Sequence, residues 1–297
     1  MIENSGRVAS SRHVKISNKD FKRLSEIVSK KSGIKMPESK IIMLESRLQK
    51  RLRIIGIDSF NTYCDYLFSK EGISNELNHM IDSVTTNKTD FFRESAHFNY
   101  LVKFALPDLM KNHGVGIRKK LTIWSAGCST GEEPYTLAMV LSDFAEKNPE
   151  LKSNFSILAT DISTKVLESA KSGIYEENRI ETISPEMRRK YLLRSKDRSQ
   201  KLIKIAPEIR SLVTFRRLNF MDPDFGIRES IDIIFCRNVI IYFEKQTQLR
   251  LMKRFCNYLK SDRYLFMGTL KHSMVLVCLW SKNLLRFIKK FSESAYK

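Results

Sequence analysis

The sequence predicts an α/β fold: a parallel-sheet domain preceded by a small all-α N-terminal domain, with a possible small antiparallel β-subdomain. Between residues 17 and 84, apolar side chains recur at helical spacing. From about residue 119, short β-branched runs alternate with helical patterns, which is typical of a doubly wound parallel sheet. A turn with two glycines joins the first of these runs to an amphipathic helix, at the place where α/β folds bind ligands.

The first domain is expected to consist of helices alone. Residues 1–16 are polar, and we expect them to be disordered. Gly33 and Pro37 follow the first helical pattern, and Gly56 ends the second. The expected helices contain Phe21–Val28, Ser39–Ile55, Phe60–Phe68 (capped by Asp58–Ser59) and Leu77–Val84.

The second of these helices carries a basic face. Arg47, Lys50 and Arg51 fall together beside its buried stripe, and only Glu45 offsets their charge. Most such faces are simply solvated. The whole chain, however, has 52 Lys and Arg against 33 Asp and Glu, a net charge of +19. This excess implies an acidic partner, and charge alone leaves open a nucleic acid, an anionic membrane or an acidic protein surface.

Five short apolar runs are expected to form the parallel sheet, and two more an antiparallel hairpin. Because helical patterns separate several of the five runs, we expect helices to connect the strands. The sheet runs are Leu121–Ser125, Phe155–Thr160, Val213–Phe215, Ile231–Phe235 and Tyr264–Met267, and the hairpin runs are Tyr191–Leu193 and Leu202–Ile205.

Ligand-binding signals gather where the strands end. Gly127 and Gly131 lie in the turn after the first strand, but no lysine follows them as in a phosphate loop. Glu132 and Glu133 follow instead, and two carboxylates would attract a cation such as the sulfonium of S-adenosylmethionine (SAM). The alternative is a tight turn with a solvated acidic helix start, which the helix dipole favours. Asp161, just past the second strand, is placed to accept ribose hydroxyls.

Two other stretches allow a functional and a plain interpretation. Residues 85–94 change from polar to aromatic. They form either a loop before a helix or a segment that folds over a ligand, with Asn87, Thr89 and Arg93 facing it. Polar residues after the fourth strand, followed by Tyr242, indicate either a wall of the same site or a core aromatic.

Cysteine spacing and hydropathy indicate the cellular compartment. The five cysteines are dispersed without a Cys-x-x-Cys pair, which excludes the usual zinc and redox spacings, so we expect no metal. Dispersed thiols suit a reducing compartment. The N-terminus lacks the apolar core of a signal peptide, and the longest apolar run, Met274–Trp280, is too short to span a membrane. We therefore expect a cytoplasmic protein with no membrane insertion.

Together these segments resemble the CheR family of chemotaxis receptor methyltransferases, which are SAM-dependent protein-glutamate O-methyltransferases. The resemblance covers roughly residues 17–268, and its specificity comes from the order and spacing of four runs. It implies a receptor-docking helical domain at 17–84 and a SAM-dependent methyltransferase (Rossmann-like) domain at 85–268. The four runs are Thr86–Glu94, Ala126–Tyr135, Ala159–Ile162 and Phe235–Phe243.

The resemblance also implies roles for particular residues. Arg93 and Tyr242 would lie near the transferred methyl group as catalytic residues. The basic helix would dock on the acidic methylated helices of a chemoreceptor through Arg47, Lys50, Arg51 and Arg53. The residues that would surround SAM are Asn87, Thr89, Arg93, Glu132, Asp161, Asn219, Phe220, Arg237 and Asn238.

This chain departs from the family pattern in two places. Family members that bind a receptor's C-terminal peptide tether use a glycine-containing loop, whereas residues 194–200 contain no glycine, which puts tether binding in doubt. After Gly268 the resemblance ends, and residues 269–297 form a divergent, basic tail. Such a change could remove a pair of strands from the sheet.

Two other functions are compatible with parts of the sequence. A non-catalytic SAM- or receptor-binding protein would agree with the unusual C-terminus. A nucleic-acid methyltransferase would agree with the positive charge, but the chain has no Pro-Pro for an Asx-Pro-Pro-aromatic motif and no Pro-Cys nucleophile. We therefore expect no nucleic-acid partner.

Overall fold

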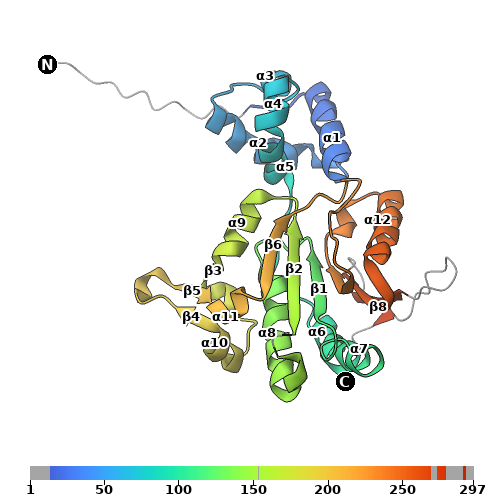
Figure 1. Ribbon diagram of the computed structural model, residues 1–297. Helices are drawn as coiled ribbons and strands as arrows, with labels where there is room; N and C mark the ends of the chain where they lie inside the picture. Colours follow the sequence, from blue (N-terminus) through green and yellow to red (C-terminus); the bar gives the residue numbers. More distant parts are fainter. Residues whose placement is uncertain (1–13, 153, 269–272, 279–289, 292–297) are drawn as a thin grey trace. The chain divides into compact units, whose positions relative to one another are not determined.

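The computed structural model describes residues 14–152, 154–268, 273–278 and 290–291 (Figure 1). The chain divides into two compact units. Of the described residues, the first unit holds 14–31 and 35–85, and the second holds 32–34 and those from residue 86 onward.

The first unit is all-helical, as predicted. Ser59 caps α3 by accepting a hydrogen bond from the amide of Thr62, and Gly56 ends α2 in the left-handed conformation. Helix α4 was not expected, because it contains Gly and Ser, which are weak helix formers. Its Gly72 packs closely on the preceding helix: a Cβ there would lie 2.0 Å from the carbonyl oxygen of Tyr66. The helices are α1 (Asn18–Ser32), η1 (Glu38–Lys40), α2 (Ile41–Ile55), α3 (Phe60–Leu67), α4 (Lys70–Asn75) and α5 (Leu77–Val84).

The N-terminal expectation needs a correction at its end. Residues 1–13 lie outside the described residues. Ile16, expected within the disordered 1–16 segment, is buried, and its amide donates to Oε2 of Glu45 at 2.8 Å. Burial of one apolar side chain and one satisfied amide therefore order the chain before α1 begins.

The second unit is built on a mainly parallel sheet of order β10-β9-β8-β7-β1-β2-β6. All five predicted sheet runs are strands in it. Figure 1 shows β6, β2 and β1 side by side, and β7 lies on the other flank of β1. The strands are β1 (Leu121–Ala126), β2 (Phe155–Asp161), β6 (Val213–Arg217), β7 (Ile231–Cys236), β8 (Leu259–Gly268), β9 (Ser273–Cys278) and β10 (Lys290–Phe291).

Each face of this sheet buries its own apolar cluster. Ile123 and Phe235 point into one cluster, which Tyr135 and Leu141 of α8 also join. On the other face, Trp124 packs in a second cluster formed with α12 and the loop after β6. Successive strand residues thus face opposite layers, as in a doubly wound fold. The helices are α6 (Ala96–Tyr100), a π-helical turn η2 (Leu101–Ala105), α7 (Leu106–His113), α8 (Glu132–Lys147), η3 (Pro149–Leu151), α9 (Thr164–Ser172) and α12 (Lys245–Tyr258).

The predicted hairpin exists and gains a third strand. Leu192–Arg194 (β4) pairs antiparallel with Leu202–Ile205 (β5), and Ile174–Glu176 (β3) pairs with the other edge of β5. In Figure 1 this small sheet lies beside α10, away from the main sheet. Its connecting helices are η4 (Glu177–Ile180), α10 (Pro185–Tyr191), η5 (Arg198–Gln200) and α11 (Pro207–Arg210).

The sequence left open whether the divergent tail removes a pair of strands from the sheet, and its described part instead forms two strands. Most of residues 269–297 lies outside the described residues. Within its described part, β9 pairs antiparallel with β8, and β10 pairs with β9. Within the described chain, we find no helix with the length and apolar character to cross a membrane.

Candidate functional site

The sheet has its topological switch point at β1. The chain leaves β1 toward β2 and β6, and then returns to β7 on the opposite side. Open α/β sheets bind ligands at the carboxyl edge of such a point. The strand register sets Ala126 level with Thr160, and Ser125 level with Phe235, so the segments that follow β1, β2 and β7 emerge together.

The glycine turn after β1 is held tightly at this edge. The amides of Gly127 and Cys128 both donate to the carbonyl oxygen of Thr160, at 2.8 and 2.9 Å. Gly127 has φ of 87°, and a Cβ there would lie 2.4 Å from Cγ2 of Val239, which follows β7. Only glycine therefore allows the β1 turn to approach the β7 turn this closely.

Asp161 joins the turn to the end of β2. Its Oδ2 accepts the amide of Ser129 at 2.9 Å, and its Oδ1 accepts the amide of Ser163 at 3.0 Å. The carboxylate is thus fixed at the sheet edge by two backbone donors. A carboxylate can accept about four hydrogen bonds, so it suits the hydroxyl donors of a ribose.

The two glutamates after the turn do not supply an unpaired negative charge, which corrects the sulfonium argument from sequence. Oε1 of Glu132 lies 2.7 Å from Nη2 of Arg179, and Oε2 of Glu133 lies 3.1 Å from Nη1 of Arg237. Burial raises the pKa of both carboxyls above the usual value, against the opposing hydrogen bonds and arginine charges. Thr130 donates to Glu132, and the hydroxyl of Ser125 donates to Glu133.

Arg237 is the centre of a buried network rather than an open ligand contact. Its side chain is only 2% exposed, and it also pairs with Glu94 at 3.3 Å and donates to the carbonyl oxygen of Arg93. The guanidinium lies over the ring of Phe98, 5.2 Å from its centroid. Burial would raise the pKa of Glu94, but the Arg237 charge and the amide of Asn238 bring it below its usual value.

The polar segment before α6 packs on the glycine turn. The carbonyl oxygen of Asn87 accepts from the hydroxyl of Ser129 at 2.8 Å, and that of Thr89 accepts from Arg179 at 2.5 Å. Nη1 of Arg93 donates to the carbonyl oxygen of Lys88 at 3.0 Å, which curls its side chain back onto the segment.

Several residues with strained backbone lie in the segments around the glycine turn. Among the described residues, Phe92, Glu94, Ser129 and Asn238 all have φ between 49° and 56° although none is glycine. Such conformations cost about 1–3 kcal/mol each and persist where surrounding contacts enforce them, often at functional sites. Asn238 and Glu94 are held to each other by a 3.0 Å hydrogen bond.

The other predicted site residues differ in whether their side chains or only their backbone lie at the sheet edge. Asn219 follows β6, and its Oδ1 accepts the amide of Met221 at 2.9 Å. The ring of Phe220 packs in the core against Phe255, so only its backbone is at the sheet edge. Tyr242 is half-buried at the end of η6 (Ile240–Tyr242).

Sequence reasoning missed Arg179, which contacts two of the predicted site residues. It lies in η4 of the β-subdomain, 90 residues after Thr89 and 47 after Glu132. No local pattern marked it, because its partners come from other segments of the chain.

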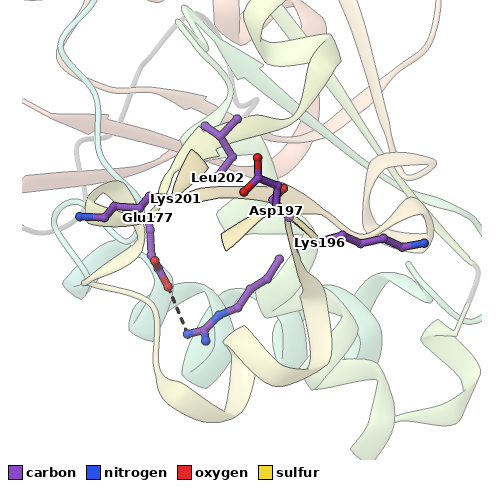
Figure 2. Close-up of a pocket in the computed structure, with 7 residues that line it drawn as sticks. Glu177, Lys196, Asp197, Lys201 and Leu202 are labelled. Carbon is purple, nitrogen blue, oxygen red and sulfur yellow. Dashed lines mark ion pairs between the residues drawn. The ribbon is translucent and has the colours of Figure 1, made fainter. Parts of the chain in front are cut away.

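A separate cavity of about 460 Å³ lies at the β4–β5 turn (Figure 2). Arg194 in its wall pairs with Glu177 at 3.2 Å. Figure 2 shows Lys196 and Lys201 extending outward in different directions, so they do not converge on one ligand. No predicted cofactor-binding residue lines it; its lining is Glu177, Arg194, Ser195, Lys196, Asp197, Lys201 and Leu202.

Comparison with known proteins identifies the family of this chain. The family description "CheR methyltransferase, SAM binding domain" matches residues 87–275, and "CheR methyltransferase, all-alpha domain" matches residues 19–85. The fold and the site thus define a SAM-dependent methyltransferase. The chain belongs to the CheR methyltransferase family, and the match extends past residue 268, where the resemblance was expected to end.

Curated relatives agree over most of the chain. The chemotaxis protein methyltransferase of Borreliella burgdorferi is 40% identical over 256 residues, which cover 86% of this chain and 89% of that protein. That of Salmonella typhimurium is 36% identical over 253 residues, covering 85% and 83% respectively. A solved DszA carbon methyltransferase matches with 15% identity over 84% of this chain and 46% of that chain; its TM-score of 0.32 is too low to support an argument.

Proposed function

We propose that this protein transfers a methyl group from SAM to glutamate side chains of chemoreceptors, as part of chemotaxis adaptation. The observation that carries the proposal is the match of both domains, in order, to the two CheR family domains. Relatives named chemotaxis protein methyltransferase support it at 36–40% identity. The dispersed cysteines favour the cytoplasm as its place of action.

The residues at the sheet edge fit the cofactor. Bound SAM supplies an electrophilic methyl group on a sulfonium. Asp161 is the proposed acceptor for its ribose hydroxyls, Glu132 and the glycine turn form one side of the site, and Asn219 and the backbone of Phe220 another. The other residues proposed to surround SAM are Asn87, Thr89, Arg93, Arg237 and Asn238.

The catalytic demand on the protein is mainly one of positioning. A glutamate side chain has an ordinary pKa of about 4.3, so it is ionised at neutral pH and needs no strong general base. Orientation of the reacting groups can lower the barrier by up to about 7–11 kcal/mol. Arg93 has a planar fork of N–H donors that suits the substrate carboxylate, and Tyr242 is proposed to face the same position.

The proposed docking surface is the exposed face of α2. Lys50 and Arg53 are exposed there, whereas Arg47 donates to the carbonyl oxygens of Val84 and Thr85. Arg51 forms an ion pair with Glu76 within the same unit. Lys50 and Arg53 therefore form the open part of the surface for an acidic receptor helix, and Arg47 and Arg51 act at its border. Because residues 194–200 contain no glycine, we propose no tether-peptide binding.

Methyl transfer tests the proposal directly. Chemoreceptor membranes and tritiated SAM are incubated with the protein, and base-labile methyl groups are counted as released methanol. Transfer is expected for the unaltered protein, and Arg93→Ala should lower turnover far more than it weakens SAM binding. SAM binding without transfer would support a non-catalytic SAM- or receptor-binding protein instead.

Charge reversal tests the docking surface separately. Lys50→Glu combined with Arg53→Glu should raise the receptor concentration needed for half-maximal methylation, because both changes repel an acidic partner. SAM affinity should not change. Lys70→Glu, an exposed reversal on α4, is the matched control and should behave as the unaltered protein. An equal loss in this control would remove α2 as the docking surface.

A further inference from the structure

Arg179 of the β-subdomain bridges two segments of the cofactor site. We propose that Arg179 is a positioning residue for SAM binding: it holds the 87–91 segment against the first turn of α8 and thereby sets the spacing across the site. The inference rests on the proposed function, because it takes these two segments as the SAM site.

A single guanidinium nitrogen makes the bridge. Nη2 of Arg179 donates to the carbonyl oxygen of Thr89 at 2.5 Å and to Oε1 of Glu132 at 2.7 Å. Asp90 lies 3.8 Å from the same nitrogen. Thr89 belongs to the segment before α6, and Glu132 begins α8 after the glycine turn. One side chain therefore joins segments that the sheet itself does not connect.

Glu132 needs this partner because it is buried. The residue is only 1% exposed, and its other oxygen accepts from the hydroxyl of Thr130 at 2.6 Å. A buried carboxylate that loses its cation carries an uncompensated charge and tends to move or to take up a proton. Either response would change the first turn of α8 and, with it, the side of the site that this turn forms.

Two neighbouring contacts fix the segment that carries Arg179. The hydroxyl of Tyr175 donates to the carbonyl oxygen of Thr130 at 2.7 Å, and the hydroxyl of Thr182 donates to that of Phe91 at 2.7 Å. Residues 175–182 thus contact both sides of the site, on both flanks of Arg179. The side chain of Arg179 is 39% exposed, but these contacts hold the backbone on both sides of it in place.

The contacts of Arg179 predict an effect on SAM affinity but not on the methyl-transfer step. Arg179 contacts Thr89, Asp90 and Glu132, and not the residues proposed to face the methyl group. Its loss should therefore weaken SAM binding while leaving turnover at saturating SAM nearly unchanged. A merely structural role would lower the amount of folded protein, and would reduce binding and turnover together.

The experiment measures SAM affinity by titration calorimetry and receptor methylation at saturating SAM, both with the full chain. Arg179→Gln removes the charge and keeps most of the stem; losing a charge-assisted hydrogen bond predicts about tenfold weaker SAM binding. Arg179→Lys keeps the charge and should recover most of the affinity. Turnover at saturating SAM should stay within about twofold for both variants, which corresponds to about 0.4 kcal/mol.

Arg188→Gln is the matched control. Arg188 also lies in the β-subdomain and donates to two carbonyl oxygens, of Ile183 and Glu181, but it does not touch the 87–91 segment or Glu132. Its variant should bind SAM normally. Normal SAM affinity in Arg179→Gln, or the same loss in Arg188→Gln, would overturn the inference while leaving the proposed function intact. Absence of SAM binding in the unaltered protein would overturn both.

If Arg179→Gln does not fold, Arg179→Lys and Thr182→Val test the inference instead. The thermal unfolding midpoint of each variant shows whether it is folded. The lysine variant should bind SAM about threefold more weakly, because a point charge cannot reproduce the planar fork. Thr182→Val removes the neighbouring bond to Phe91 and should also weaken SAM binding. Unchanged affinity in both folded variants would contradict the bridge.

Discussion

The buried His97 should make the second unit sensitive to mild acid. Its imidazole is almost fully buried in α6, and neither ring nitrogen has a hydrogen-bond partner among the described residues. Burial, together with the nearby positive charge of Arg237, lowers the pKa of His97 to about 3, against the opposing charge of Glu94. The imidazole therefore stays neutral in the folded protein at pH values where an unfolded chain would protonate it.

The sign and size of the effect follow from these values. Because an exposed histidine has a pKa of about 6.5, the unfolded state binds one more proton than the folded state between pH 6.5 and about 3. Stability from this residue is fully present above pH 6.5 and is lost progressively as the pH falls. At 1.36 kcal/mol per pH unit, lowering the pH from 7 to 5 should cost about 2 kcal/mol. Glu94 contributes only at lower pH, because its pKa is already below the usual value.

Urea unfolding followed by tryptophan fluorescence is the assay, because Trp124 is buried in the second unit. His97→Phe keeps a ring against Phe266 and removes the titrating group, so most of the loss between pH 7 and 5 should disappear. His79→Gln, an exposed histidine of the first unit, should leave the pH dependence unchanged. The same slope in His97→Phe as in the unaltered protein would refute the reasoning.

Three further outcomes follow from the contacts described above. Gly127→Ala places a Cβ 2.4 Å from Cγ2 of Val239 and should cost about 1–3 kcal/mol of unfolding free energy, partly restored by adding Val239→Ala; no loss would mean that the turn relaxes freely. Arg51→Met leaves Glu76, which is 2% exposed and accepts from Arg51 at 2.7 Å and 2.5 Å, as an unpaired buried carboxylate. It should cost about 3–5 kcal/mol, and adding Glu76→Gln should recover much of this in denaturant unfolding. Asp161→Asn should weaken SAM binding about tenfold in calorimetry, because a charged acceptor for hydroxyl donors is lost; unchanged affinity would remove Asp161 from the cofactor site.

Local sequence patterns determined the elements and the place of the site. Short apolar runs located all five strands of the sheet and the hairpin, and period-3.6 hydrophobicity located most helices, because both patterns depend only on the local order of residues. Gly127 and Gly131 marked the turn after β1. Weakly patterned pieces escaped this reasoning: α4 contains Gly72, and β3 is only Ile174–Glu176.

The charge arrangement of the site was decided only by tertiary structure. The sequence shows Glu132 and Glu133 as an acidic pair, but the fold pairs them with Arg179 and Arg237, which lie 47 and 104 residues further along the chain. On α2, the fold likewise pairs Arg51, which the sequence shows only as part of a basic face, with the buried carboxylate of Glu76. Hydrophobic spacing is a local property that a short window reveals. The partner of a charged side chain depends on which distant segments meet, and only the folded chain specifies that.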